Sequence, residues 1–83
     1  MSSVDIDYKA TGAMLRKLRD AHGYSQDYLS EVTGVTSSAV SHWENGQRVP
    51  PIEKLVKLGY LYCMPIDDIV CKIIYGKPIK KVV

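Results

Sequence analysis

The sequence is poor in the residues that build disulfide frameworks and zinc sites. It has two cysteines, Cys63 and Cys71, and two histidines, His22 and His42, and these do not form closely spaced pairs. A structural zinc ion takes four ligands, usually as closely spaced pairs of Cys or His. We therefore expect no metal ion, and we expect both thiols to be free and buried.

Long apolar runs, a leader sequence and a catalytic cluster are missing as well. No apolar stretch approaches the roughly 18 residues needed to cross a membrane, and the first five residues lack the basic and apolar regions of a signal peptide. No set of His, Cys and carboxylate residues has catalytic spacing, and Asp67-Asp68 fits the first turn of a helix, where the dipole favours negative charge. These absences predict a cytoplasmic protein that is neither membrane-bound nor an enzyme and needs no cofactor.

The net charge is small, at +2. Such a balance permits nucleic-acid binding without arguing for it. Four lysines near the end are most simply interpreted as solubilising: Lys72, Lys77, Lys80 and Lys81. The 83 residues predict a single domain over residues 1–83, with a core over about 8–75 and a basic, apolar tail at 76–83. A domain of this size buries only ~60% of the surface of its unfolded chain, so we expect a partner or a dimer to help stabilise it.

Helical periodicity, interrupted by glycine, proline and capping residues, predicts five short helices. They are expected over residues 8–22, 26–33 and 37–44, from Pro50-Pro51 to about 62, and from Pro65 to about 75. The alternation at residues 4–8 is strand-like but too short to carry a sheet. The apolar positions expected to face one core are Met14, Leu15, Leu18, Ala21, Leu29, Val32, Val40, Trp43, Ile52, Leu55, Val56, Leu58, Tyr62, Ile66, Ile69, Val70 and Ile73. The sequence thus predicts an all-α fold, a compact five-helix bundle.

The second and third predicted helices meet across Gly34-Val35, with Ser25 and Thr36 as their N-caps. Two short helices joined by a tight turn are typical of a helix-turn-helix, whose second helix enters the major groove of DNA while the first crosses the backbone. The outer face of the third helix is polar, through Ser37, Ser38, Ser41 and His42. Periodicity alone indicates DNA binding only weakly, because such helix pairs occur in many helical proteins.

Over about residues 12–70 the chain resembles the Cro/phage-repressor (XRE-like) helix-turn-helix family. The matching fragments are, in order, Gly12-x-x-Leu15-Arg16-x-Leu18-Arg19, Gly23-Tyr24-Ser25-Gln26-x-x-Leu29, Gly34-Val35-Thr36, Val40-Ser41-x-Trp43-Glu44-Asn45-Gly46, Arg48-x-Pro50, Leu55-Val56-x-Leu58 and Pro65-Ile66-Asp67-Asp68-Ile69. Each fragment is unspecific, but their order and spacing together are highly specific. The resemblance implies a lambda-repressor-like DNA-binding domain.

The resemblance also implies roles for individual residues. Gln26 matches a glutamine that contacts the DNA backbone and braces base-reading residues. The positions that face the groove are Thr36, Ser37, Ser38, Ser41 and His42, and the loop positions that contact phosphates are Asn45, Gln47 and Arg48. Arg19 and Glu44 match a partly buried ion pair that ties the first helix to the third, which gives Arg19 a structural role in place of a phosphate contact. Trp43 is expected in the core.

Some positions depart from the family pattern or leave its specificity open. Ser30 and Gly59 stand where alanine is usual, and Cys63 stands where a glycine commonly ends the fourth helix, so we expect a tighter or differently shaped turn there. Serine hydroxyls discriminate poorly between bases. His42 is the best candidate for a direct base contact, a phosphate or water contact being the alternative, and DNA shape is a further source of specificity.

The function implied is a sequence-specific transcriptional regulator, most simply a repressor, that binds double-stranded DNA as a homodimer on a palindromic site. The alternative is the antitoxin of a toxin–antitoxin pair, which binds DNA and also a toxin protein. A third candidate is a helical protein-interaction module without DNA binding. The apolar tail is expected to pack either on its own domain or on a partner, and it contains Ile73, Ile74, Tyr75, Ile79, Val82 and Val83.

Overall fold

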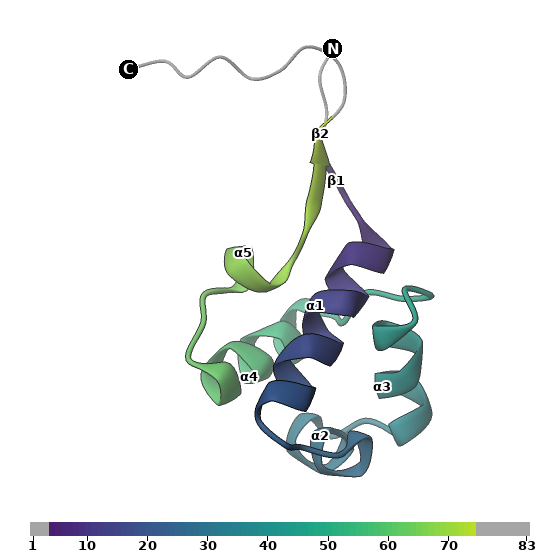
Figure 1. Ribbon diagram of the computed structural model, residues 1–83, viewed down its shortest axis with the longest axis vertical. Coiled ribbons are helices and arrows are strands. Elements are labelled where there is room, and N and C mark those ends of the chain that lie inside the picture. Colours follow the sequence, from purple (N-terminus) through teal and green to yellow (C-terminus); the bar gives the residue numbers. More distant parts are fainter. Residues whose placement is uncertain (1–3, 75–83) are drawn as a thin grey trace.

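The computed structural model describes residues 4–74, which form five helices and a two-stranded sheet. The elements are, in chain order, β1 (Val4–Ile6), α1 (Tyr8–Ala21), α2 (Gln26–Thr33), α3 (Ser37–Glu44), α4 (Ile52–Tyr62), α5 (Ile66–Ile69) and β2 (Lys72–Ile74). The helices gather in one bundle, and the two strands project from one end of it (Figure 1). The predicted class, an all-α bundle of five helices, is confirmed, with the small sheet as an addition. None of the helices within residues 4–74 is long and apolar enough to span a membrane.

The boundaries of α2 and α3 agree with the prediction because both helices are capped by local side chains. The Ser25 hydroxyl accepts a hydrogen bond of 3.0 Å from the Tyr28 amide, and the Thr36 hydroxyl accepts one of 3.1 Å from the Ala39 amide. Each cap satisfies an amide that would otherwise lack a partner at a helix start. Gly34 ends α2 in the left-handed conformation, with φ of 76°. Local sequence therefore fixes where these two helices begin and end.

The core lies between the five helices, where α1 packs against α3 and α5, and α4 packs against α2 and α5. It consists of Leu15, Leu29, Val40, Trp43, Leu55, Leu58, Tyr62, Ile69 and Val70. Three predicted core positions, Ala21, Ile52 and Val56, are wrong because their side chains are exposed. Ala21 is the last residue of α1, and α4 turns the face with Leu55, Leu58 and Tyr62 inward, which leaves Ile52 and Val56 outside.

The largest difference from the prediction is at the last helix. Instead of continuing to about residue 75, α5 ends at Ile69, and Val70 is already extended, with φ of −86° and ψ of 120°. The chain then forms β2, which pairs antiparallel with β1 in the register Val4↔Ile74, Asp5↔Ile73 and Ile6↔Lys72. The alternation at residues 4–8, judged too short for a sheet, therefore does form a strand.

The hydrogen bonds beside the sheet explain why so short a ribbon forms. The Asp7 amide donates to the Cys71 carbonyl at 2.9 Å, and the Cys71 amide donates to the Thr11 hydroxyl at 2.9 Å. Thr11 is 1% exposed, so these bonds anchor the base of the ribbon to the first turn of α1. The β-branched residues that follow Val70 also favour the extended conformation. The rest of the predicted tail, residues 75–83, lies outside the described residues.

Helices α1 and α3 approach each other at Gly12. A Cβ atom at this position would lie 2.4 Å from the Trp43 carbonyl oxygen and 2.7 Å from that of Glu44. Contacts this short do not occur in folded proteins, so only glycine allows the two backbones to pack at this distance. Gly12 therefore allows the close spacing of α1 and α3.

The turn after α4 is closed by Cys63 in the left-handed conformation, with φ of 54° and ψ of 44°. Its backbone N–H donates to the carbonyls of Gly59 and Tyr60, as in a glycine-capped helix end. Cys63 is exposed and Cys71 is half-buried, so the prediction of buried thiols is wrong, although both thiols are free. A non-glycine residue in this conformation costs roughly 1–2 kcal/mol.

Replacing Cys63 by glycine is expected to raise the free energy of unfolding by about 1 kcal/mol, because the left-handed strain disappears and no buried contact is lost. Urea denaturation followed by circular dichroism measures the change. Cys63→Ala is the matched control, since it removes the thiol but keeps the strained Cβ, and it should leave stability close to that of the original chain. A glycine variant no more stable than the alanine variant would contradict the prediction.

Candidate nucleic-acid interface

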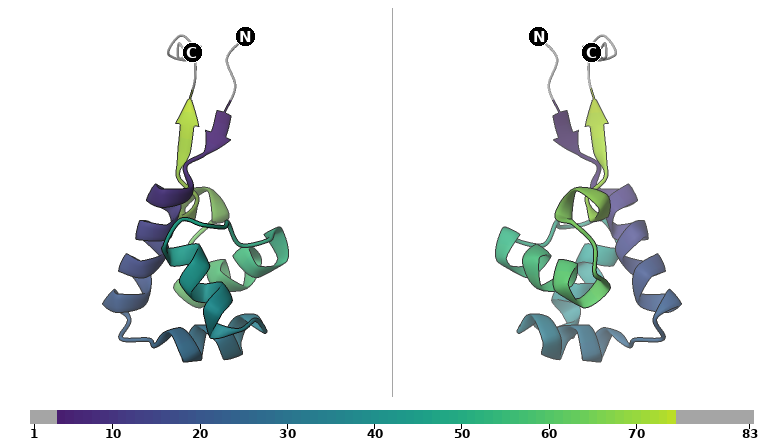
Figure 2. Two further views of the ribbon diagram at one scale, coloured as in Figure 1. Left: turned by 90° about the vertical axis from the view of Figure 1, so that its right-hand side faces the viewer. Right: turned by 90° about the vertical axis from the view of Figure 1, so that its left-hand side faces the viewer.

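The turn between α2 and α3 is held by hydrogen bonds that the side chain of Ser30 reinforces. The Gly34 and Val35 amides donate to the Ser30 carbonyl at 2.9 and 3.2 Å. The Ser30 hydroxyl donates to the Val35 carbonyl, a bond that an alanine would not make. Figure 2 shows α2 and α3 meeting at this turn, with α3 facing the viewer in the left-hand view. The relative orientation of the two helices is therefore fixed by the turn itself.

The two faces of α3 differ in burial as the sequence predicts. Val40 and Trp43 are 2% and 5% exposed and hold the helix in the core. The predicted DNA-facing positions are exposed at Thr36, Ser38, His42, Asn45, Gln47 and Arg48 and half-buried at Gln26, Ser37 and Ser41. The apolar inner face anchors α3, and its outer face presents small hydroxyl groups without bulky side chains.

The loop after α3 folds back over the end of that helix. The Gln47 and Arg48 amides donate to the His42 carbonyl at 2.9 and 3.3 Å. As a result the side chains of His42, Gln47 and Arg48 line one open, polar hollow of about 250 Å³. A cation and two hydrogen-bonding side chains around an open hollow suit a phosphate oxygen. Asn45 stands apart from this group and donates to the Ser41 hydroxyl at 3.4 Å.

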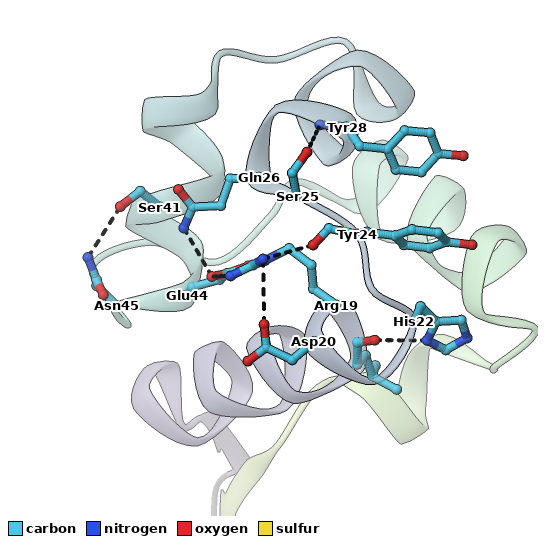
Figure 3. Close-up of polar contacts among 11 residues, drawn as sticks. Arg19, Asp20, His22, Tyr24, Ser25, Gln26, Tyr28, Ser41, Glu44 and Asn45 are labelled. Atoms are coloured by element: carbon cyan, nitrogen blue, oxygen red, sulfur yellow. Dashed lines mark hydrogen bonds and ion pairs between the residues drawn. The ribbon is translucent and has the colours of Figure 1, made fainter.

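Arg19 and Glu44 lie in direct contact and join α1 to the end of α3 (Figure 3). Arg19 Nε donates to Glu44 Oε2 at 2.6 Å, and Nη2 donates to Oε1 at 3.0 Å. The third hydrogen bond of the guanidinium, at 2.9 Å, goes from Nη1 to the Tyr24 carbonyl. The two side chains are 13% and 4% exposed, and the Glu44 hydrogen bond raises the pKa of Arg19 above its ordinary value. The guanidinium of Arg19 therefore makes its hydrogen bonds within the protein, as a structural role requires.

Gln26 is hydrogen-bonded to the same ion pair, a contact that the sequence does not predict. Its Nε2 donates to Glu44 Oε1 at 3.1 Å. A carboxylate that pairs with arginine accepts hydrogen bonds only, so the amide nitrogen of Gln26 must face it. Within residues 4–74 the carbonyl oxygen and the second N–H of the amide have no hydrogen-bond partner, so both can bind another molecule. No local pattern links residues 26 and 44, because the helix-turn-helix geometry alone brings them together.

An aromatic cluster lies on the other side of the ion pair from Ser41 and Asn45 (Figure 3). The rings of His22, Tyr24 and Tyr28 stack or tilt against one another, and His22 and Tyr24 also contact Tyr62. Tyr62 is 6% exposed, and its hydroxyl has no hydrogen-bond partner among the described residues. Burial, with a further contribution from the charge of Glu44, raises the pKa of Tyr62 to about 12.

The pKa of Tyr62 predicts a loss of stability in strong base. In the unfolded chain tyrosine titrates near pH 10. Because the folded value is raised to about 12, the neutral phenol contributes fully below pH 10, and its contribution is lost between about pH 10 and 12. The loss is of the order of 1–3 kcal/mol. Between pH 10 and 12 the free energy of unfolding of the original chain should fall by this amount relative to that of Tyr62→Phe. Parallel pH profiles of the two proteins would contradict the raised pKa of Tyr62.

The sequence profile of the Helix-turn-helix family matches residues 15–59, more than half of the chain. A relative in Bacillus subtilis (strain 168), the uncharacterized HTH-type transcriptional regulator YobD, is 38% identical over 55 residues, which are 66% of this chain and 49% of that protein. The chain therefore spans about half the length of this relative. It spans 22%, 18% and 19% of three archaeal proteins named as putative HTH-type transcriptional regulatory proteins.

Two solved structures have similar folds. The restriction-modification controller protein C.AhdI from Aeromonas hydrophila has a TM-score of 0.69 and 32% identity, over 76% of this chain and 96% of that one. The P22 c2 repressor, solved in complex with a synthetic operator, has a TM-score of 0.67 and 27% identity, over 71% of this chain and 89% of that one.

Proposed function

Because the chain belongs to the helix-turn-helix family of the Cro and phage-repressor type, we propose that it is a sequence-specific transcriptional regulator that inserts α3 into the major groove of DNA. The observation that carries the proposal is the contrast between the two faces of α3, one buried and one polar and open. The P22 c2 repressor, which has a similar fold, was solved in complex with a synthetic operator, and this supports DNA binding by the present fold. Repression is the simplest mode of regulation, and a cytoplasmic location and a lack of enzymatic activity belong to the same proposal.

The residues of the interface divide between two tasks. Thr36, Ser37, Ser38, Ser41 and His42 are proposed to face the groove, and Gln26 is proposed to contact the DNA backbone and to brace the residues that read the bases. Asn45, Gln47 and Arg48 are proposed to contact phosphates, and the cation of Arg48 in an open hollow supports this. Phosphate contacts position the protein on the duplex, and base-edge contacts select the sequence. Glu44 takes part indirectly, because it holds the amide of Gln26.

Selection from a random double-stranded DNA library with the purified chain tests this function. We expect enrichment of a palindromic site whose half-sites lie about one helical turn apart. Retardation of any DNA at low salt, falling steeply as salt rises, is expected for the phosphate contacts. A chain that fails to retard DNA even at low salt would instead be a protein-interaction module.

His42→Ala is expected to relax the base preference at one position in each half-site, because His42 is the largest exposed side chain on the outer face of α3. Loss of a direct base contact removes about 1–3 kcal/mol of discrimination. Repeating the selection with the variant measures this. Lys17→Ala, at an exposed position on α1, is the control and should leave the profile unchanged. A uniform loss of affinity with an unaltered profile would assign His42 to a phosphate instead.

The regulator is proposed to act as a homodimer, because one small domain with few base contacts rarely supplies useful specificity. The antitoxin alternative stays a prediction. It assigns the toxin contact to the tail, and residues 75–83 of that tail lie outside the described residues.

A further inference from the structure

The outer side of α4 carries an apolar ridge. Ile52, Val56 and Tyr60 follow one another at intervals of four residues and are 67%, 43% and 83% exposed. Residues at this spacing lie in one row along a helix. The three side chains, named here the α4 ridge, therefore form a continuous apolar surface on a helix whose other face already fills the core.

An apolar groove of about 450 Å³ lies beside the α4 ridge. It is lined on one side by residues of α4 and on the other by the segment that leads into α5, and its lining consists of Val56, Gly59, Tyr60, Cys63, Met64, Pro65 and Ile66. Figure 1 shows this segment rising from the end of α4 to α5. None of the proposed DNA contacts belongs to the ridge or to the groove. A partner on the ridge or the groove would therefore cover none of the side chains proposed to contact DNA.

We propose that the α4 ridge is the contact with a second copy of this chain, in which the two α4 helices pack antiparallel about a two-fold axis near Val56. The inference rests on the proposed dimeric regulator and names its interface. A two-fold axis makes the same patch meet itself. With the axis at Val56, Ile52 of one copy lies level with Tyr60 of the other. There it faces the groove, where Gly59 has no side chain to obstruct it.

The charges that flank the ridge support an antiparallel arrangement. Glu53 and Lys57 are both exposed and lie one turn apart on the same side of the ridge. Within its own chain Glu53 lies 3.8 Å from the half-buried Lys54, and because the Glu53 carboxylate is 74% exposed this long ion pair contributes little. In an antiparallel pair this flank meets the same flank of the second copy, and Glu53 of each copy lies opposite Lys57 of the other. A parallel pair would put the two flanks on opposite sides and form neither contact.

Sedimentation equilibrium of the full chain over a range of concentrations tests the interface. We expect a dimer for the original chain and at least a tenfold weaker dimerisation for Val56→Asp. Because Val56 is exposed, circular dichroism should confirm that the variant keeps its fold. Lys17→Asp on α1 is the matched control and should dimerise normally. A monomeric original chain, or a dimer that Val56→Asp leaves unchanged, would overturn the proposal. The second result would locate the dimer contact elsewhere, for example in residues after 74.

A charge exchange tests the orientation. Glu53→Lys and Lys57→Glu alone each place like charges opposite one another and should weaken the dimer severalfold. The double variant Glu53→Lys/Lys57→Glu restores opposite charges and should recover dimerisation, whereas a double variant as weak as the singles would overturn the antiparallel model. DNA retardation on the same samples separates the two proposals. Dimers without DNA binding would refute the regulator only, and DNA binding by a chain that stays monomeric would refute the interface only.

Discussion

Glu44→Ala is expected to lower the free energy of unfolding by about 3–5 kcal/mol, because it leaves the guanidinium of Arg19 buried without its partner. The carboxylate is 4% exposed and accepts hydrogen bonds from Arg19 and Gln26. Small domains are stable by only about 5–15 kcal/mol, so a large share of the molecules should be unfolded at 37 °C. Thermal and urea denaturation measure the loss.

Asp20→Ala is the matched control for this variant. Asp20 also contacts Arg19, at 3.6 Å, but its side chain is 65% exposed. Exposed ion pairs are worth about 0–1 kcal/mol, and the control should melt close to the original chain. A Glu44→Ala variant that melts with the Asp20→Ala control would mean that the ion pair does not stabilise the fold.

Gly12→Ala is expected to destabilise the fold by at least about 2 kcal/mol, although alanine favours the helix by about 1 kcal/mol relative to glycine. The added Cβ would lie 2.4 Å from a backbone oxygen of α3, and neither atom belongs to a flexible side chain that could turn away. Helix α1 must therefore move away from α3, which disturbs the Arg19–Glu44 contact as well. Urea denaturation gives the loss of stability.

Ala13→Ser provides the comparison for Gly12→Ala. It changes the next residue of the same helix, which is exposed, and it should alter stability by less than about 0.5 kcal/mol. If the two variants unfold at the same urea concentration, the close approach of α1 and α3 is not as tight as the structure indicates.

The helices whose ends are set by capping side chains and glycine could be predicted from the sequence. The ends of α2 and α3 depend on Ser25, Thr36 and Gly34, each within three residues of the amide or turn that it serves. The fold class followed from the same signals together with the resemblance to a known family.

The small sheet could not be predicted, because its strands are far apart in sequence. Val4 pairs with Ile74, and no local signal announces that partner. A short apolar run such as the one after Pro65 fits a buried helix or a strand equally well. The hydrogen bonds of Cys71 to Asp7 and Thr11, about sixty residues away, decide in favour of the strand.

In the candidate site, too, features set by neighbouring residues could be predicted, and contacts between helices could not. The polar positions of α3 follow from helical periodicity, but the bond from Gln26 to Glu44 depends on how two helices are placed. For a related reason the apolar pattern of α4 predicts more buried residues than the structure has. Its apolar residues cover more than one face, and only the packed bundle decides that Leu55 points inward and Val56 outward.

The pairing of β1 with β2 also determines how the domain can be joined to other proteins. Val4 and Ile74 are partners in the antiparallel ladder, and Cα atoms of such partners lie about 4.5–5.5 Å apart. A surface loop of a host protein can therefore accept residues 4–74 with almost no separation of the loop ends. The domain can therefore be inserted into a loop of another protein as well as fused to one of its termini. In such a chimera, unfolding of the host would separate the two ends of the domain and load both strands. The hydrogen bonds of Cys71 with Asp7 and Thr11 would transmit that load to the first turn of α1.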